Sequence, residues 1–145
     1  MRILGLDIGE RRVGVAISDE LGFSAHGLDV IERKKNGEDI KRIAELVSQY
    51  NVSKVVVGLP KNMDGSLGPS GEAVKKYAAK LQNTLGIELD FWDERLTTVA
   101  AEKILIEADM SRKKRKTVID KMAAVLILQS YLDFKIRVDS REKLQ

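Results

Sequence analysis

Asp7 is the residue whose position in this chain most strongly suggests chemistry. It follows an apolar run, Ile3 to Leu6, so the strand that carries it is expected to be buried. A carboxylate near a protein core is costly to desolvate unless it is solvated, hydrogen-bonded or bound to a cation. Gly9 and Gly14 follow closely and leave room for a phosphate group to approach the backbone. We therefore favour a functional role for Asp7 over the alternative, a turn residue that closes a hairpin.

Glu94 and Asp120 are weaker candidates when each is considered alone. Arg95 follows Glu94 directly, and an exposed ion pair between the two would have little energetic value. Asp120 and Thr117 have the spacing of a capping box at the start of a helix. The expected topology favours both acids, because the strands that precede Asp7 and Glu94 end near the same edge of the sheet and the last helix must pack back across it. The three carboxylates can then converge at that edge.

Converging carboxylates predict a divalent metal site. Their like charges repel unless cations neutralise them, and hard oxygen ligands select Mg²⁺ or Mn²⁺. The absence of cysteine and the single histidine, His26, argue against a transition-metal site, and we expect His26 to be an ordinary strand residue. Two Mg²⁺ or Mn²⁺ ions about 3.5–4 Å apart activate water and stabilise the leaving oxygen in phosphodiester hydrolysis. The residues therefore predict a metal-dependent nuclease, with Asp7, Glu94 and Asp120 as metal ligands and catalytic residues.

A basic run immediately before Asp120 supplies the charge that binding of a nucleic acid needs. It contains no acid and consists of Arg112, Lys113, Lys114, Arg115 and Lys116. Lysine and arginine contact the phosphates of nucleic acids, so we expect this run to bind the substrate backbone. The alternative is a solvated linker between two helices.

Composition limits the remaining function classes. The chain has 145 residues, of which 43% are hydrophobic and 32% charged, and its net charge is only +3. A chain of this length can bury one core, and the lack of cysteine excludes disulfide scaffolds and zinc–thiolate sites. No export signal or membrane span is visible, so we expect a soluble, cytoplasmic protein without a membrane partner. We expect one domain over residues 1–134, followed by a polar, frayed tail over residues 135–145.

Hydrophobic periodicity predicts an α/β fold. The pattern favours a mixed five-stranded sheet, with a three-stranded antiparallel meander followed by parallel strands, and helices on both faces. The expected strands are 2–8, 13–18, 25–32, 52–57 and 87–92, and the expected helices are 37–50, 71–85, 99–108 and 117–134. Function is then expected at the strand ends. The polar loop that contains Asn62, Asp64, Gly65 and Ser66 is either a tight turn or a loop that binds the nucleic-acid backbone.

Four ordered segments carry a resemblance to a known family. They are Gly-Leu-Asp-Ile-Gly-Glu-Arg-Arg-Val-Gly-Val-Ala (residues 5–16), Val-Gly-Leu-Pro-Lys-Asn-Met-Asp-Gly-Ser (57–66), Asp-Glu-Arg-Leu-Thr-Thr (93–98) and Ile-Asp-Lys-Met-Ala-Ala-Val-Leu-Ile-Leu (119–128). Together they resemble the YqgF family, also called RuvX-like, whose members are described as Holliday junction resolvases or pre-16S ribosomal RNA nucleases. The resemblance runs from Met1 to about Phe134.

This resemblance implies a ribonuclease H-like fold, with the three acids named above at the family's metal-binding positions. It also implies that Arg12, Asn62 and Arg95 contact the substrate or support the site. The implied function is maturation of the 5′ end of 16S ribosomal RNA, which we rank first. We rank cleavage of four-way DNA junctions second, because an analogy of fold is a weak warrant for a substrate. Ribosomal particles are a further expected partner, and the sequence leaves open whether the chain acts as a monomer or a dimer.

Two other functions remain as alternatives. The pattern from Asp7 to Ala16 also resembles the first phosphate loop of actin-like ATPases and sugar kinases, but those enzymes need two lobes and this chain supplies one. A non-catalytic RNA-binding ribosome-assembly factor would use the basic run equally well. Retention of all three acids argues against it, because a protein that only binds gains nothing from carboxylates that face phosphates.

Overall fold

A mixed five-stranded sheet forms the centre of the computed structural model, which describes the backbone of residues 1–96 and 112–143 and the side chains of residues 1–96 and 121–142. The strands are β1 (Arg2–Ile8), β2 (Arg12–Ser18), β3 (Ala25–Glu32), β4 (Val52–Leu59) and β5 (Glu88–Asp93), in the order β3-β2-β1-β4-β5. β1, β2 and β3 pair antiparallel, whereas β4 and β5 continue the sheet parallel to β1. The expected mixed sheet is confirmed.

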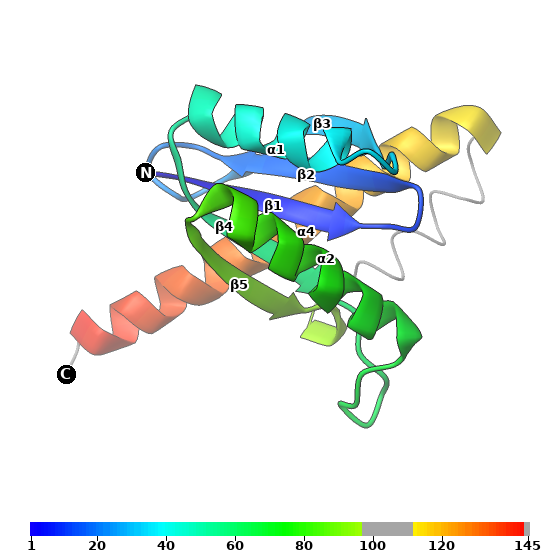
Figure 1. The fold of residues 1–145 in the computed structure, drawn as a ribbon. Helices are drawn as coiled ribbons and strands as arrows, with labels where there is room; N and C mark the ends of the chain where they lie inside the picture. The colour runs from blue at the N-terminus through cyan, green and yellow to red at the C-terminus, as the bar shows by residue number, and fades with distance from the viewer. Residues whose placement is uncertain (97–111, 144–145) are drawn as a thin grey trace.

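Helices cover both faces of this sheet (Figure 1). α1 (Glu38–Gln49) and α2 (Pro69–Leu85) lie on one face, and α4 (Arg112–Lys143) crosses the other. α2 ends at Gly86, whose φ of 65° is the left-handed conformation that closes many helices. The helical spacing of apolar residues around Ile43 and Val74 correctly predicted α1 and α2.

The alternation of side chains along each strand divides the core into two layers. Leu4, Leu6 and Val57 point to the α1 and α2 side, where they pack with Ile43 and Leu81. The alternate residues of the same strands face α4, in a second layer that includes Ile3, Val56, Trp92, Ala124 and Leu128. Successive strand residues point to opposite faces of the sheet. The place of a residue in this alternation therefore decides which of the two layers its side chain faces.

Glycines let α4 lie close to the sheet. A Cβ atom on Gly5 would stand 2.7 Å from the Cβ of Leu128, and one on Gly27 would stand 2.6 Å from Cγ of Lys121. A Cβ on Gly58 would collide with the end of the Ile127 side chain. The helix thus crosses β3, β1 and β4 over positions that carry no side chain.

Polar contacts attach the C-terminal half of α4 to β4 and β5. Lys54 of β4 donates to the Tyr131 hydroxyl at 2.8 Å and pairs with Asp90 of β5 at 2.9 Å. The Tyr131 hydroxyl donates in turn to Asp90 at 3.1 Å, and the Trp92 ring meets Tyr131 edge-on at 6.1 Å. The hydrogen bond from Lys54 is the main cause of the lowered pKa of Asp90.

Three expectations about the C-terminal half need correction. The last helix begins at Arg112 rather than Thr117, so residues 112–116 belong to the helix and the interpretation as a linker is wrong. Thr117 and Asp120 consequently lie within α4, and the capping-box interpretation is wrong as well. The helix also continues to Lys143 through the segment expected to be frayed. Neither extension contains glycine or proline, and adding residues to an existing helix is much easier than starting one.

Two further expectations concern the helix before α4 and membrane-spanning segments. The helix expected over residues 99–108 lies outside the described residues. Within the described ranges, no helix is both long and apolar enough to cross a membrane.

The contact between Gly5 and α4 yields a prediction about stability. We expect Gly5→Ala to lower the free energy of unfolding by about 1–3 kcal/mol, because the new methyl group meets the backbone-proximal Cβ of Leu128 and the Ala124 carbonyl. Gly27→Ala is the matched control, since its neighbour is the flexible side chain of Lys121. Urea unfolding followed by circular dichroism measures both. Equal effects of the two substitutions would contradict this account of the packing.

Candidate active site

Asp7 is a buried carboxylate on the α4 side of the sheet. The residue is 7% exposed, and in the antiparallel ladder it is paired with Gly14 of β2. It stands two residues after Gly5, which faces α4, so the alternation of β1 directs it to the same layer. The next residue, Ile8, belongs to the opposite layer. Asp7 therefore lies at the carboxyl end of β1, on the face of the sheet that α4 covers.

Glu94 reaches the same region from β5. It begins η1 (Glu94–Leu96), a 3₁₀ turn directly after β5. Its Oε1 atom lies 3.3 Å from the position that a Cβ on Gly58 would occupy. Gly58 follows Val57, the partner of Leu6 in the β1–β4 ladder, so it is level with Asp7 on the neighbouring strand. The expected convergence of strand ends thus brings Asp7 and Glu94 to two sides of Gly58.

Asp120 and the basic run lie in the first turns of α4, where the structure describes the backbone alone. The predicted cluster of three carboxylates therefore stays a prediction. Among the residues with described side chains, no group of three histidine or acidic residues is arranged to hold a metal ion. His26 lies in β3, and its ring is 3.0 Å from the Ser24 hydroxyl.

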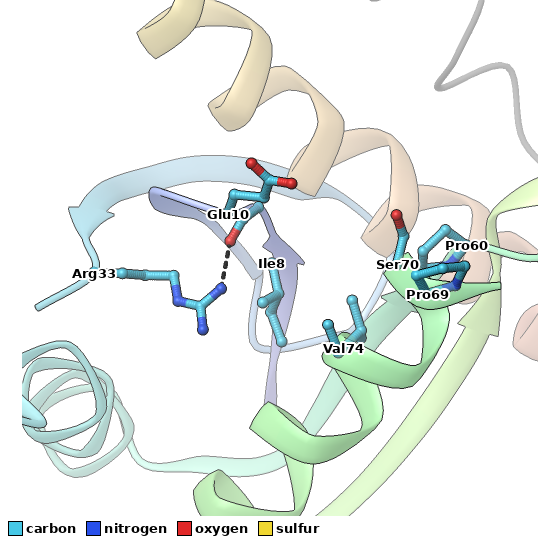
Figure 2. Close-up of a pocket in the computed structure, with 9 residues that line it drawn as sticks. Ile8, Glu10, Arg33, Pro60, Pro69, Ser70 and Val74 are labelled. Carbon is cyan, nitrogen blue, oxygen red and sulfur yellow. Dashed lines mark hydrogen bonds between the residues drawn. The ribbon is translucent and has the colours of Figure 1, made fainter. Parts of the chain in front are cut away.

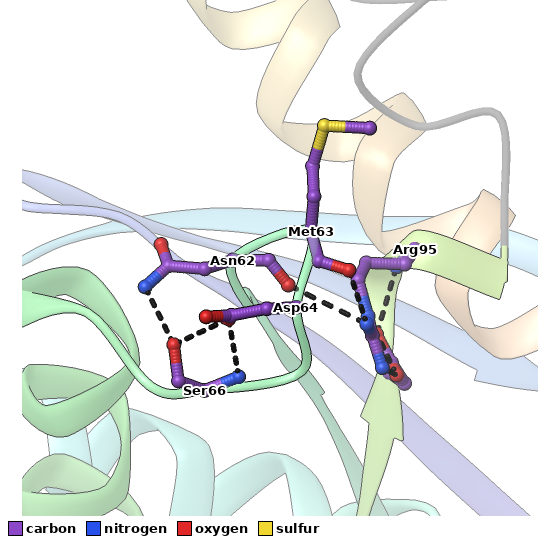
Figure 3. A network of polar contacts seen from close by, with 6 residues as sticks. Asn62, Met63, Asp64, Ser66 and Arg95 are labelled. Carbon is purple, nitrogen blue, oxygen red and sulfur yellow. Dashed lines mark hydrogen bonds and ion pairs between the residues drawn. The ribbon is translucent and has the colours of Figure 1, made fainter.

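The loop after β4 is held by its own polar side chains (Figure 3). Asn62 donates from its side chain to the Ser66 hydroxyl at 3.0 Å, and that hydroxyl donates to Asp64 at 2.6 Å. The Asn62 amide also donates to the Ser66 carbonyl at 2.9 Å, while Gly65 takes a φ of 89°. These contacts form the tight turn that was one of the two interpretations of this loop. They also lower the pKa of Asp64, chiefly through the bond from Ser66.

Arg95 joins this loop to the end of β5. Its Nη2 atom lies 2.7 Å from Asp93, to which its Nε atom also donates. Its Nη1 atom donates to the carbonyl oxygens of Met63 at 3.2 Å and Asn62 at 3.4 Å. The hydrogen bond from Arg95 is the main cause of the lowered pKa of Asp93. The guanidinium thus acts as a clamp between strand and loop, which fits the supporting role among those expected for it.

Arg12 starts β2 at the same edge of the sheet. Its carbonyl oxygen accepts a hydrogen bond of 2.8 Å from the Gly9 amide, which closes the turn between β1 and β2. Arg33 secures that turn from the far side by donating to the Gly9 carbonyl at 2.7 Å. Arg33 was not among the predicted site residues, because its only signal in the sequence was a cation directly after β3. Gly58 was not predicted as part of the site either. A glycine at the end of the β-branched run of β4 indicates that another chemical group packs closely against the strand there.

Solved structures with the same fold define the class of this molecule. The chain is similar to T. thermophilus RuvC in complex with a Holliday junction substrate, with a TM-score of 0.57 and 13% identity over 94% of this chain and 96% of the other. It is also similar to the fowlpox virus Holliday junction resolvase, with a TM-score of 0.53 and 15% identity over 92% and 99% of the two chains. At these identities the similarity shows a shared fold, which is ribonuclease H-like.

Relatives with much higher identity define the family. The family model described as "RuvX: Holliday junction resolvase" matches residues 1–134, and the chain belongs to this family of nucleases. A Bacillus cytotoxicus protein named "Putative pre-16S rRNA nuclease" is 61% identical over 93% of this chain and 100% of its own length. A Bacillus mycoides protein with the same name is 62% identical, with the same coverage of both chains.

The clamp formed by Arg95 predicts a local change in dynamics. Arg95→Lys keeps the charge but loses the forked geometry, so we expect severalfold faster amide exchange at Asn62 and Gly65. Hydrogen exchange followed by NMR measures both amides. Arg42→Lys, which alters an ion pair with Asp29 between α1 and β3, is the control that should leave this loop unchanged. Unchanged exchange at Asn62 and Gly65 in Arg95→Lys would contradict the clamp.

The lowered pKa of Asp93 predicts a dependence on pH. The unfolded carboxyl has a pKa of about 3.9, so its contribution to stability is present above about pH 4 and is lost as the pH falls through the lower folded pKa. We therefore expect Asp93→Asn to be less stable than the wild type at pH 7 and the difference to shrink below pH 4. Urea unfolding at both pH values measures it. A difference that stays constant with pH would contradict the ionic role of Asp93.

Proposed function

We propose that this chain is a metal-dependent nuclease that processes the 5′ end of precursor 16S ribosomal RNA. The observation that carries the proposal is the pair of carboxylates, Asp7 and Glu94, on two sides of Gly58 under α4. The names of the relatives that are more than 60% identical support the choice of RNA as substrate.

The chemistry of the donor set fits a hard divalent cation. Carboxylate oxygens are the ligands that Mg²⁺ and Mn²⁺ prefer, and the Glu94 carboxylate lies beside Gly58, which is level with Asp7 on the neighbouring strand. Asp120 stands about one helical turn before Ala124, which packs over Gly5 of β1, and we assign it as the third ligand from that register. When bound, such ions lower the pKa of water and stabilise the charge on a leaving oxygen.

The remaining residues hold the strand in place for hydrolysis. In this reaction a water oxygen forms a bond to phosphorus, the bond from phosphorus to one ribose oxygen breaks, and that oxygen leaves with a proton. Arg12 and the basic run at residues 112–116 would bind the backbone phosphates on either side. Asn62 and Ser66 shape the loop beside the site, and Arg95 fixes that loop to β5.

A four-way DNA junction is the second candidate substrate. The description of the matching family favours it, since that description is a Holliday junction resolvase. A junction has two scissile strands related by symmetry, so this function would require two copies of the chain acting together.

A cleavage assay separates these functions. We expect the wild type to cut 5′-extended 16S precursor RNA in Mg²⁺ or Mn²⁺ and not in chelator, and Asp7→Asn to lose activity on the order of 10³-fold while still binding RNA. Asp139→Asn, an exposed residue of α4, is the matched control that should keep activity. Product mapping on the RNA and on a four-way DNA junction measures both substrates.

The outcomes lead to different conclusions. Cleavage of the junction alone would replace the proposed substrate by the second candidate. A folded wild type that binds RNA but cuts neither substrate would contradict the nuclease proposal and leave a non-catalytic RNA-binding protein.

A further inference from the structure

A hollow of about 260 Å³ opens beside the turn that follows β1 (Figure 2). Its walls come from the end of β1, the residue after β4 and the first turns of α2. The apolar part consists of Ile8, Pro60, Pro69, Ala73 and Val74, and the polar rim consists of Glu10, Arg33 and Ser70. None of these residues has a role in the carboxylate pair described above.

Arg33 makes two contacts at this rim. Besides its bond to the Gly9 carbonyl, its guanidinium lies 4.6 Å above the centre of the Tyr77 ring. The Tyr77 hydroxyl donates at 2.7 Å to Asp39, a carboxylate of α1 that is only 4% exposed. A guanidinium has five N–H donors, and Arg33 uses one of its Nη1 hydrogens on Gly9. These two contacts restrain the exposed side chain, and the bond to Gly9 takes up one of its five donors.

The hollow is adjacent to the candidate active site. Ile8, which lines it, directly follows Asp7, and the two side chains point to opposite faces of the same strand end. A nucleic-acid strand whose phosphate lies at Asp7 can thus pass over the edge of the sheet and reach the hollow with a neighbouring nucleotide.

The lining matches a nucleobase better than a phosphate. A base presents flat apolar faces and a polar edge, and ligand pockets typically combine an apolar lining with a few placed polar groups. A phosphate would leave the apolar wall of Ile8, Pro60 and Val74 without a partner. The volume lies below that of most small-molecule pockets, which suits a single base rather than a larger group.

We propose that this hollow binds one unstacked nucleobase of the substrate strand next to the cleaved position, with its acceptor atoms toward Arg33. This inference rests on the proposed nuclease function and adds a subsite to it. Single-stranded RNA is recognised in this way, by bases that leave the stack and are bound at their faces and edges.

An abasic scan tests the subsite. A short single-stranded RNA is prepared as a series in which one nucleoside at a time lacks its base, so that every phosphate is kept. Fluorescence anisotropy measures the Kd of each RNA for the Asp7→Asn chain, which leaves the RNA uncut. We expect one position where loss of the base weakens binding about tenfold, and little change elsewhere.

A substitution that fills the hollow supplies the second arm. Ala73→Leu adds volume at an exposed helical position of the lining, so we expect weaker binding of the intact RNA and loss of the position dependence. Ala79→Leu makes the same change at an exposed position of α2 outside the lining and should preserve the scan. Circular dichroism checks that both variants fold.

The result separates this inference from the function on which it rests. A scan without a sensitive position, or one whose sensitive position persists in Ala73→Leu, would overturn the subsite even if the wild type cuts RNA. Failure of the folded chain to bind or cut RNA at all would overturn the nuclease proposal and the subsite together.

Discussion

The close packing of α4 on the sheet is the constraint on which the rest of this structure depends. Van der Waals contact at this separation is available only where the strands present hydrogen in place of a side chain, as at Gly5 and Gly58. At Gly58 the same missing atom also leaves room for the Glu94 carboxylate. Gly58 thus permits both the close approach of the helix and the position of the Glu94 carboxylate, which links the core to the candidate active site.

Side chains alternate between the two faces of the sheet along β1, so the last two residues of this strand face different layers. Asp7 belongs to the face under α4, whereas Ile8 belongs to the face of α1 and α2. The flanking loops are fixed by guanidinium groups: Arg33 bonds the turn after β1, and Arg95 bonds the loop after β4. Forked donors suit this purpose because one side chain can hold several backbone or carboxylate oxygens at once. The polar loops around the candidate active site are thereby held to the sheet.

Local patterns predicted most of the secondary structure but misjudged the last helix. The runs in β1, β4 and β5 and the amphipathic periods of α1 and α2 were all recognisable, because each buries a face that repeats at a fixed period. The ends of α4 lack such a face, so their helical structure left no periodic signal. The contacts of Arg95 left no signal in the sequence either: its side chain turns back to Asp93 and reaches the loop at Met63.

The sequence by itself determined the strand and helix types, the presence of acids at strand ends and the family, because these depend on residue spacing along the chain. The tertiary structure alone decided that Asp7 and Glu94 share one face beside Gly58, and that Arg33, Tyr77 and Asp39 form a supported rim for a hollow. Those features join residues from strands and helices that are distant in the sequence. Their contacts depend on the order of the strands in the sheet and on how closely each helix approaches the sheet. The periodicity of a single segment predicts neither of these.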